Sequence, residues 1–138
     1  MSRRKGRVLA FQGLYSWDIG GNPLDDVLKL AWAENDKGKP VDEESGAFAR
    51  ILIVGVAEHQ ADIDERIAKH LNGWEFGRVN KVSLAILRMS VYALVYQRDI
   101  PASIVIDEAI TIAKEYGQDD SYKFINAVLD NIKKTVEN

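Results

Sequence analysis

The sequence contains no cysteine, which excludes disulfides, thiolate metal sites and cysteine nucleophiles. It has no apolar run approaching the roughly 18 residues of a membrane-spanning helix. The basic residues at the amino end are not followed by the apolar stretch of a secretion signal, so we expect a soluble, cytoplasmic protein that does not associate with membranes. Neither a glycine-rich phosphate loop nor a nucleophile elbow is present, and no enzymatic activity is predicted.

Length and hydrophobic spacing together predict the fold class. The 138 residues, of which 46% are hydrophobic, suffice for one sizeable core, so residues 1–138 are expected to form a single domain. No segment alternates apolar and polar residues as a strand does, whereas spacings of three, four and seven recur from end to end. We therefore predict an all-α protein, a compact bundle of about six to seven helices.

The charge is unevenly distributed along the chain. The formal net charge is −3, yet Arg3, Arg4, Lys5 and Arg7 precede the first acidic residue, Asp18. We call these four residues the basic arm. The rest of the chain carries 14 basic against 21 acidic side chains. An acidic body disfavours indiscriminate binding of nucleic acid, while a local basic patch still attracts phosphates within a Debye length of roughly 10 Å.

The amino-terminal half is predicted to contain two helices before a loop. The first helix is expected over residues 3–18, ending at the glycines of residues 20–21. Asn22 is expected to cap a second helix with Pro23 in its first turn and apolar residues from Leu24 to Ala31. Residues 35–40 are polar and turn-forming, which indicates a loop.

Asp42 is predicted to cap a long helical stretch that reaches about residue 71, with a possible break near Ala61. Trp74 and Phe76 follow it in a short connection. We expect these two aromatic side chains to be buried and to anchor the two halves of the fold.

Three further helical segments are expected in the carboxyl-terminal half. The broad apolar stripe of residues 81–97 predicts a central, well-buried helix. Residues 104–116 are predicted to form the next helix, with Gly117 as a left-handed cap. Any of residues 119–121 can cap the last helix.

The basic arm is the strongest functional feature that the residues themselves provide. Lysine and arginine neutralise phosphates, and arginine also stacks on unpaired bases. Four cations at a helix amino end also oppose the helix dipole, which raises the weight of a binding role until it equals that of the alternative, a solvated helix start. Gln12, Tyr15 and Trp17 follow at helical spacing and suit single-stranded RNA, although burial is the commoner role for Trp17, and Tyr15 suits a half-exposed position.

The remaining polar clusters do not predict catalytic or metal-binding chemistry. His59 and His70 are flanked by carboxylates but lie eleven residues apart, about three helical turns, which is too far for one ion. We interpret them as surface residues. The carboxylate pairs at residues 107–108 and 119–120 are explained by the preference for acidic residues in the first turn of a helix.

A family resemblance sharpens this interpretation. Residues 101–129 read PASIVIDEAITIAKEYGQDDSYKFINAVL and resemble the carboxyl-terminal signature of the NusB family of transcription antitermination factors. The segments RRKGR and QGLYSW near the amino end, and ILRMSVY at residues 86–92, resemble the family's other two landmarks in the same order. The resemblance therefore covers essentially the whole chain.

The resemblance implies a NusB-like helical fold without catalytic activity, cofactor or metal. It implies binding to the boxA element of nascent ribosomal RNA transcripts together with NusE, a ribosomal small-subunit protein. Within the transcription elongation complex, the two proteins would help RNA polymerase to pass terminators.

The resemblance also implies which residues bind. The RNA-binding positions would be Arg3, Arg4, Lys5, Arg7, Gln12, Tyr15, Asp120, Lys123 and Phe124. The partner-binding positions would be Tyr15, Ser83 and Arg88. We expect the basic arm to meet the start of the last helix in a single groove for unpaired nucleotides.

Three positions depart from the family pattern. Ser83 and Ala93 stand where relatives commonly have acidic residues, and Ala127 replaces a common glycine. If the missing acids pair with NusE in relatives, this chain must contact NusE differently.

Two other functions are compatible with the sequence. One is a helical protein–protein adaptor or self-associating dimer without direct RNA binding, in which Tyr15, Trp17 and the basic arm form the interface. The other is a fragment of an enzyme, since a NusB-like domain also precedes some ribosomal RNA methyltransferases. No cofactor-binding segment follows in this sequence, so catalysis would have to come from a partner.

Overall fold

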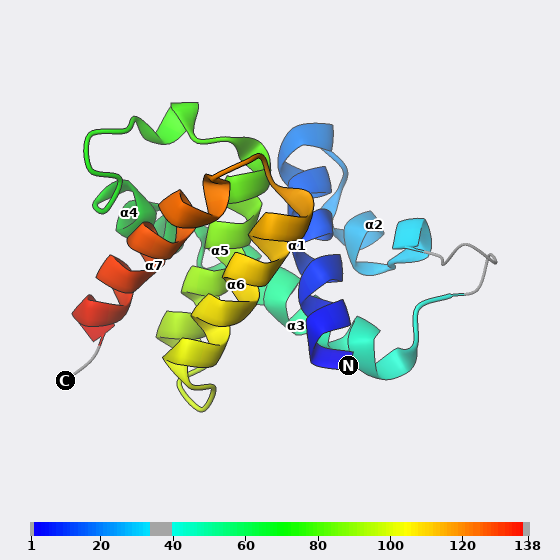
Figure 1. The fold of residues 1–138 in the computed structure, drawn as a ribbon. Helices are drawn as coiled ribbons and strands as arrows, with labels where there is room; N and C mark the ends of the chain where they lie inside the picture. The colour runs from blue at the N-terminus through cyan, green and yellow to red at the C-terminus, as the bar shows by residue number, and fades with distance from the viewer. Residues whose placement is uncertain (1, 34–39, 137–138) are drawn as a thin grey trace.

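The computed structural model describes residues 2–33 and 40–136, and these residues form helices without any strand (Figure 1). Within these described residues, seven α-helices and two short 3-10 helices follow in the order α1 (Ser2–Gly20), α2 (Leu24–Leu28), η1 (Ala31–Ala33), α3 (Glu43–Glu58), α4 (Gln60–Ala68), η2 (Phe76–Arg78), α5 (Lys81–Tyr96), α6 (Ala102–Tyr116) and α7 (Ser121–Val136). The all-α prediction is confirmed. None of these helices combines the length and the hydrophobicity that a membrane crossing requires.

Helix α5 lies at the centre of the bundle, as its broad apolar stripe predicted. It packs against α1, α3, α4, α6 and α7. Its buried residues run continuously from Ser83 to Val91 and include Ala93 and Leu94. Asn80 caps the helix, because its side-chain oxygen accepts hydrogen bonds from the backbone N–H groups of Val82 and Ser83.

Helices α1 and α3 form one packed pair of the bundle, and α6 and α7 form another (Figure 1). Leu9, Ala10, Phe11 and Leu14 of α1 are buried in the core. Gly13 permits the close approach of α1 to its neighbours, because a Cβ atom there would lie 2.9 Å from Ile53 Cδ1. The amino-terminal cations at the start of α1 therefore contact α6 on one side and α3 with its cap on the other.

The helix boundaries in the first half differ from the predictions in two places, both at α2. Pro23, not Asn22, precedes α2 as its cap residue, and the Asn22 amide instead donates a hydrogen bond to the Ser16 hydroxyl. Helix α2 ends at Leu28, because Leu30 adopts a positive φ of 57°. The stretch capped by Asp42 breaks at His59, which confirms the expected break near Ala61.

The expected loop at residues 35–40 falls on residues outside the described ranges, except for Pro40. Asp42 does cap α3, since its carboxylate accepts a hydrogen bond from the Ser45 backbone N–H.

Two predictions for the second half are wrong. Trp74 is 61% exposed and does not anchor the fold by burial, although Phe76 packs partly against the core. Gly117 is extended, with φ −90° and ψ 177°, and the left-handed residue of this connection is Asp120, with φ 66°. Asp120 therefore has the left-handed conformation that we predicted for Gly117.

Candidate nucleic-acid interface

The basic arm occupies the first two turns of α1 and is held from one side by α6. Arg4 Nε donates a hydrogen bond of 3.0 Å to Glu108 Oε2, and Arg4 Nη2 lies 3.0 Å from the same oxygen. Arg7 Nη1 lies 3.4 Å from Glu108 Oε1. Glu108 stands beyond the first turn of α6, so our explanation of residues 107–108 as first-turn acids is wrong. Glu108 instead neutralises cations that oppose the dipole of α1.

Helix α3 and its cap hold the arm from the other side. Lys5 Nζ lies 3.0 Å from Asp42 Oδ1. The Arg3 guanidinium lies 4.9 Å above the centre of the Phe48 ring, within the range of a cation–π contact. The Ser45 backbone N–H and the Lys5 ammonium stabilise the ionised carboxylate of Asp42, which lowers its pKa to about 2.

The four cations of the arm differ in their access to a ligand. The side chains of Arg4 and Lys5 are each 55% exposed, whereas that of Arg7 is 7% exposed. Burial lowers the pKa of Arg7, and the neighbouring Glu108 opposes this effect. A guanidinium starts from so high a pKa that Arg7 stays charged at neutral pH. Arg3, Arg4 and Lys5 are therefore the cations available to phosphates.

An open cleft of about 680 Å³ lies beside the arm. We call it the arm cleft. Its charged residues are Arg3, Arg4, Arg7, Asp99 and Glu108. Ile100, Pro101 and Ile104, at the start of α6, form an apolar wall.

A second cleft of about 530 Å³ lies between the α4–α5 connection and the start of α7. We call it the aromatic cleft. The rings of Trp74 and Phe124 meet in it edge to face, with centroids 6.0 Å apart. Asn80, Gln118 and Asp120 add amide and carboxylate groups to its lining. Lys123 Nζ lies 3.6 Å from Asp120 Oδ1, and both side chains are mostly exposed.

Trp74 was not predicted as a functional residue. Because Trp74 follows a helix in a short connection beside a glycine, we expected a buried aromatic residue there. Its contact with Phe124 joins residues that are 50 positions apart in the sequence. Only tertiary structure brings the two rings together.

The two clefts do not form the single groove that we expected. The arm cleft is lined by residues from Asp99 to Glu108, before and within the first half of α6, and the aromatic cleft by residues from Gln118 onward, beyond its end. At about 1.5 Å per residue, the 15 residues of α6 span roughly 20 Å. Figure 1 shows the amino terminus at the bottom of the bundle and the α6–α7 connection at its top.

Residues of α1 and the end of α6 lie between the two clefts. The Phe11 and Tyr116 rings are 5.3 Å apart and join these helices. Tyr15 is 37% exposed, and Gln12 is half-buried. Trp17 packs partly against the core, as predicted for a helical tryptophan.

Two of the residues predicted to bind a partner are buried. Ser83 is 3% exposed, although it lines the aromatic cleft. Arg88 is 5% exposed, and its guanidinium pairs with Asp64 at 2.9 Å and with Asp18 at 3.3 Å. A direct partner contact at Arg88 stays a prediction, and its burial favours a structural role.

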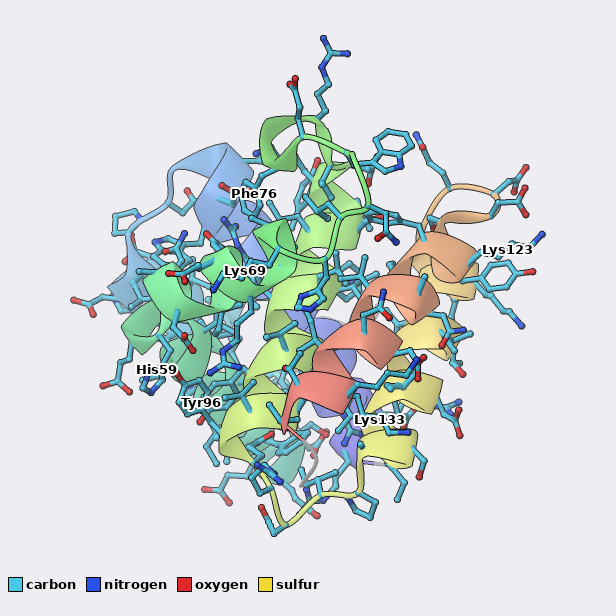
Figure 2. All side chains as sticks on the ribbon, turned by 90° about the vertical axis from the view of Figure 1, so that its left-hand side faces the viewer. His59, Lys69, Phe76, Tyr96, Lys123 and Lys133 are labelled. Atoms are coloured by element: carbon cyan, nitrogen blue, oxygen red, sulfur yellow. The ribbon has the colours of Figure 1, made fainter. Side chains whose placement is uncertain are left out.

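The histidines have separate surroundings. Figure 2 shows His59 beside Tyr96 and distant from Lys123. The His59 and Tyr96 rings stack with centroids 4.0 Å apart, and the Tyr96 hydroxyl donates a 2.6 Å hydrogen bond to Asp62. That bond lowers the pKa of Asp62 and raises the pKa of Tyr96. His70 Nδ1 lies 2.9 Å from the Arg66 carbonyl oxygen. Within the described ranges, no group of three or more His, Cys, Asp or Glu residues is arranged to hold a metal ion.

Comparisons with known proteins agree with the resemblance seen in the sequence. A family model described as the NusB family matches residues 4–134. The transcription antitermination protein NusB of Treponema denticola is 50% identical over 133 residues, covering 96% of this chain and 96% of that protein. Such relatives are named as antitermination proteins rather than enzymes, in agreement with the prediction of no catalytic activity.

Solved structures agree as well. A structure of T. maritima NusB has a TM-score of 0.82 and 34% identity, covering 96% of this chain and 90% of that chain. A chain in the crystal structure of antitermination factors NusB and NusE in complex with dsRNA has a TM-score of 0.85 and 26% identity, covering 97% of both chains. By its sequence over nearly its full length and by its fold, the chain belongs to the NusB family.

Proposed function

We propose that this protein is a transcription antitermination factor that binds boxA RNA of ribosomal RNA transcripts together with NusE and helps RNA polymerase to read through terminators. The observation that carries the proposal is its similarity, over 97% of the chain, to a chain of the NusB–NusE–dsRNA complex. It would act in the cytoplasm within the transcription elongation complex.

The described surface supports RNA binding in physical terms. Arg3, Arg4 and Lys5 present accessible charge at one end of α6. At the other end, Phe124 and Trp74 offer aromatic surfaces for unstacked bases, and Lys123 offers a second phosphate contact. Because the clefts are separate, a bound strand would extend along α1 and α6 past Gln12 and Tyr15 rather than occupy one pocket.

NusE would bind near the aromatic cleft and the exposed part of α1. Tyr15 is accessible, and Ser83 contributes a small polar side chain to the cleft. With serine here, the contact would depend on shape and hydrogen bonding rather than on an ion pair. Arg88 would support this surface indirectly, because its ion pairs fix α1, α4 and α5 relative to one another.

The test is a fluorescence titration of a boxA oligonucleotide at several salt concentrations, with and without NusE. Replacement of Arg3, Arg4 and Lys5 together by glutamine should abolish most of the affinity. If each cation contacts one phosphate, the slope of log K against log salt should fall in magnitude by about 2, since each contact to a single strand contributes about 0.7. Arg7 is spared because its burial would confound binding with folding.

A matched control removes the same charge elsewhere. Lys29, Lys69 and Lys134 have side chains of 72%, 66% and 67% exposure, and each pairs with a nearby acid, as Arg4 and Lys5 do. Their joint replacement by glutamine should leave the affinity and the salt slope close to wild type. Equal effects of the two triple variants would contradict a specific role for the arm.

Self-association is a second candidate, favoured by the exposed apolar side chains of Tyr15 and Ile19, one turn apart on α1. A homodimer using this face would cover part of the proposed RNA surface. Gel filtration with and without boxA RNA separates the two: RNA should dissociate such a dimer, whereas a dimer unaffected by saturating RNA would favour the adaptor function.

A further inference from the structure

The arm cleft has two features that charge attraction alone does not require. Opposite the arginines, Ile100, Pro101 and Ile104 form an apolar wall, and Ile104 is 47% exposed. Between the arginines lies Glu108, whose side chain is only 16% exposed and which contacts both Arg4 and Arg7. A simple phosphate contact needs neither an apolar wall nor a carboxylate.

We propose that the arm cleft binds one nucleotide of the RNA, whose backbone phosphate replaces the Glu108 carboxylate on Arg4 while its sugar and base pack against Ile104. This inference rests on the proposed function. It assigns Glu108 as a built-in competitor that sets the affinity of the basic arm.

The exchange involves Arg4 because its geometry leaves it free to move. Its side chain is 55% exposed, and its two contacts with Glu108 both go to one oxygen, Oε2. Arg7 contacts the other oxygen, Oε1, and is almost fully buried. When Arg4 turns to a phosphate, Glu108 therefore keeps a cationic partner and is not left as an unpaired, partly buried charge.

The charge balance of the cleft determines what removal of Glu108 should do. Three arginines face two carboxylates, Glu108 and Asp99, which leaves one net positive charge. Glu108→Gln raises this to two and weakens the attachment of Arg4, while the glutamine oxygen can still accept a hydrogen bond from Arg7. RNA binding should therefore become tighter and more strongly dependent on salt.

The experiment measures boxA oligonucleotide affinity of the full chain at several salt concentrations for Glu108→Gln and for Asp107→Asn. Asp107 is the exposed neighbour on the same helix, does not line the cleft, and loses the same charge. We expect Glu108→Gln to bind roughly threefold tighter or more, the scale of one exposed ion pair, with a smaller change for Asp107→Asn. In an Arg4→Gln background the gain should shrink to that of Asp107→Asn, because the freed cation is then absent and only the general change of charge remains.

A second pair of variants, one in the apolar wall and one matched control, tests the contact with the sugar and base. Ile104 and Ile51 are 47% and 52% exposed, and Ile51 lies on α3, away from the cleft. Ile104→Ser should weaken binding several-fold and Ile51→Ser should not, with both variants melting near the wild-type temperature.

The outcomes separate the inference from the proposed function. If the wild type binds and Glu108→Gln binds no tighter than Asp107→Asn, Glu108 only positions the arginines and the competition is refuted. If Ile104→Ser binds like the wild type, no nucleotide lies on the wall. A wild type without affinity for boxA RNA overturns the proposed function itself, and this inference with it.

Discussion

Arg88 and Asp64 are joined by two parallel hydrogen bonds of 2.9 Å, one from Nε to Oδ1 and one from Nη2 to Oδ2. The pair connects the middle of α5 to α4. Arg88 Nη1 also lies 3.3 Å from Asp18 Oδ2, near the end of α1. The Arg88 side chain is 7% exposed and those of the two aspartates are a quarter exposed or less. One buried guanidinium therefore connects three helices.

Arg88→Met should destabilise the protein strongly, because it leaves the partly buried Asp64 without its cation and Asp18 with only the more distant Lys81, 3.8 Å away. We expect a loss of about 3 kcal/mol in the free energy of unfolding, measured by urea denaturation. Asp64→Asn should cost less, since Arg88 keeps Asp18. A loss below about 1 kcal/mol for Arg88→Met would mean that the network is solvated and that the residue is free for partner contacts.

The contact between Gly55 and Tyr92 predicts a second effect on stability. The Tyr92 ring lies directly on the backbone of α3, so a Cβ atom at position 55 would overlap the ring. Gly55→Ala should destabilise by about 1 to 3 kcal/mol, as overpacking does, despite the higher helix propensity of alanine. Gly77 is the control, because nothing lies within 4 Å of a Cβ there and its φ is not positive. Adding Tyr92→Ala should remove the penalty of Gly55→Ala, and its persistence would point to another cause.

Hydrophobic periodicity predicted the all-α fold well, because the apolar residues that recur at helical spacing are also the residues that are buried in the core. The central position of α5 followed from an apolar stripe too broad for a surface helix. Periodicity failed where local backbone geometry decides, as at Leu30 and Asp120, which take positive φ values where no glycine marks the position. It also failed for Trp74, whose exposure depends on how the α4–α5 connection lies across the bundle.

The candidate site was less predictable than the fold. The basic arm was evident from charge order alone, and its exposed residues lie where a helix start places them. Glu108 was missed because its partners lie 101 and 104 positions away, and a carboxylate in a helix has no local signature of such a role. The single groove was wrong because neither charge nor resemblance specifies that α6 separates the arm from the start of α7.

Asp42 should show a pH-dependent contribution to stability. Its folded pKa, about 2, lies below the ordinary 3.8, so the ionised carboxylate favours the folded state. The contribution is therefore fully present above about pH 5 and is lost as the pH falls through 3.8 toward 2. An NMR titration should find the midpoint near 2. Lys5→Gln should raise it only in part, because the larger effect comes from the Ser45 N–H, and a return to the ordinary pKa would contradict this order of causes.

Trp74 should matter for binding and not for folding. Since its side chain is mostly exposed, Trp74→Ala should change the free energy of unfolding by no more than about 0.5 kcal/mol. If a base stacks on it, the same change should weaken boxA binding roughly tenfold, the scale of one base–aromatic stack. Trp74→Phe keeps an aromatic face and should retain most of the affinity. Wild-type affinity for Trp74→Ala would remove this residue from the interface.

Asp120→Asn should tighten RNA binding without straining the backbone. Asp120 has a φ of 66°, a conformation that asparagine tolerates well, so the variant should fold normally. The change removes a negative charge from the aromatic cleft and releases Lys123 from its 3.6 Å ion pair, so both groups become more favourable to phosphate. We expect roughly threefold tighter binding at low salt, with the gain shrinking as salt rises. Asp130→Asn is the control, because Asp130 also pairs with a lysine of α7 but does not line the cleft. Weaker binding of Asp120→Asn at matched salt would place the phosphates elsewhere on the protein.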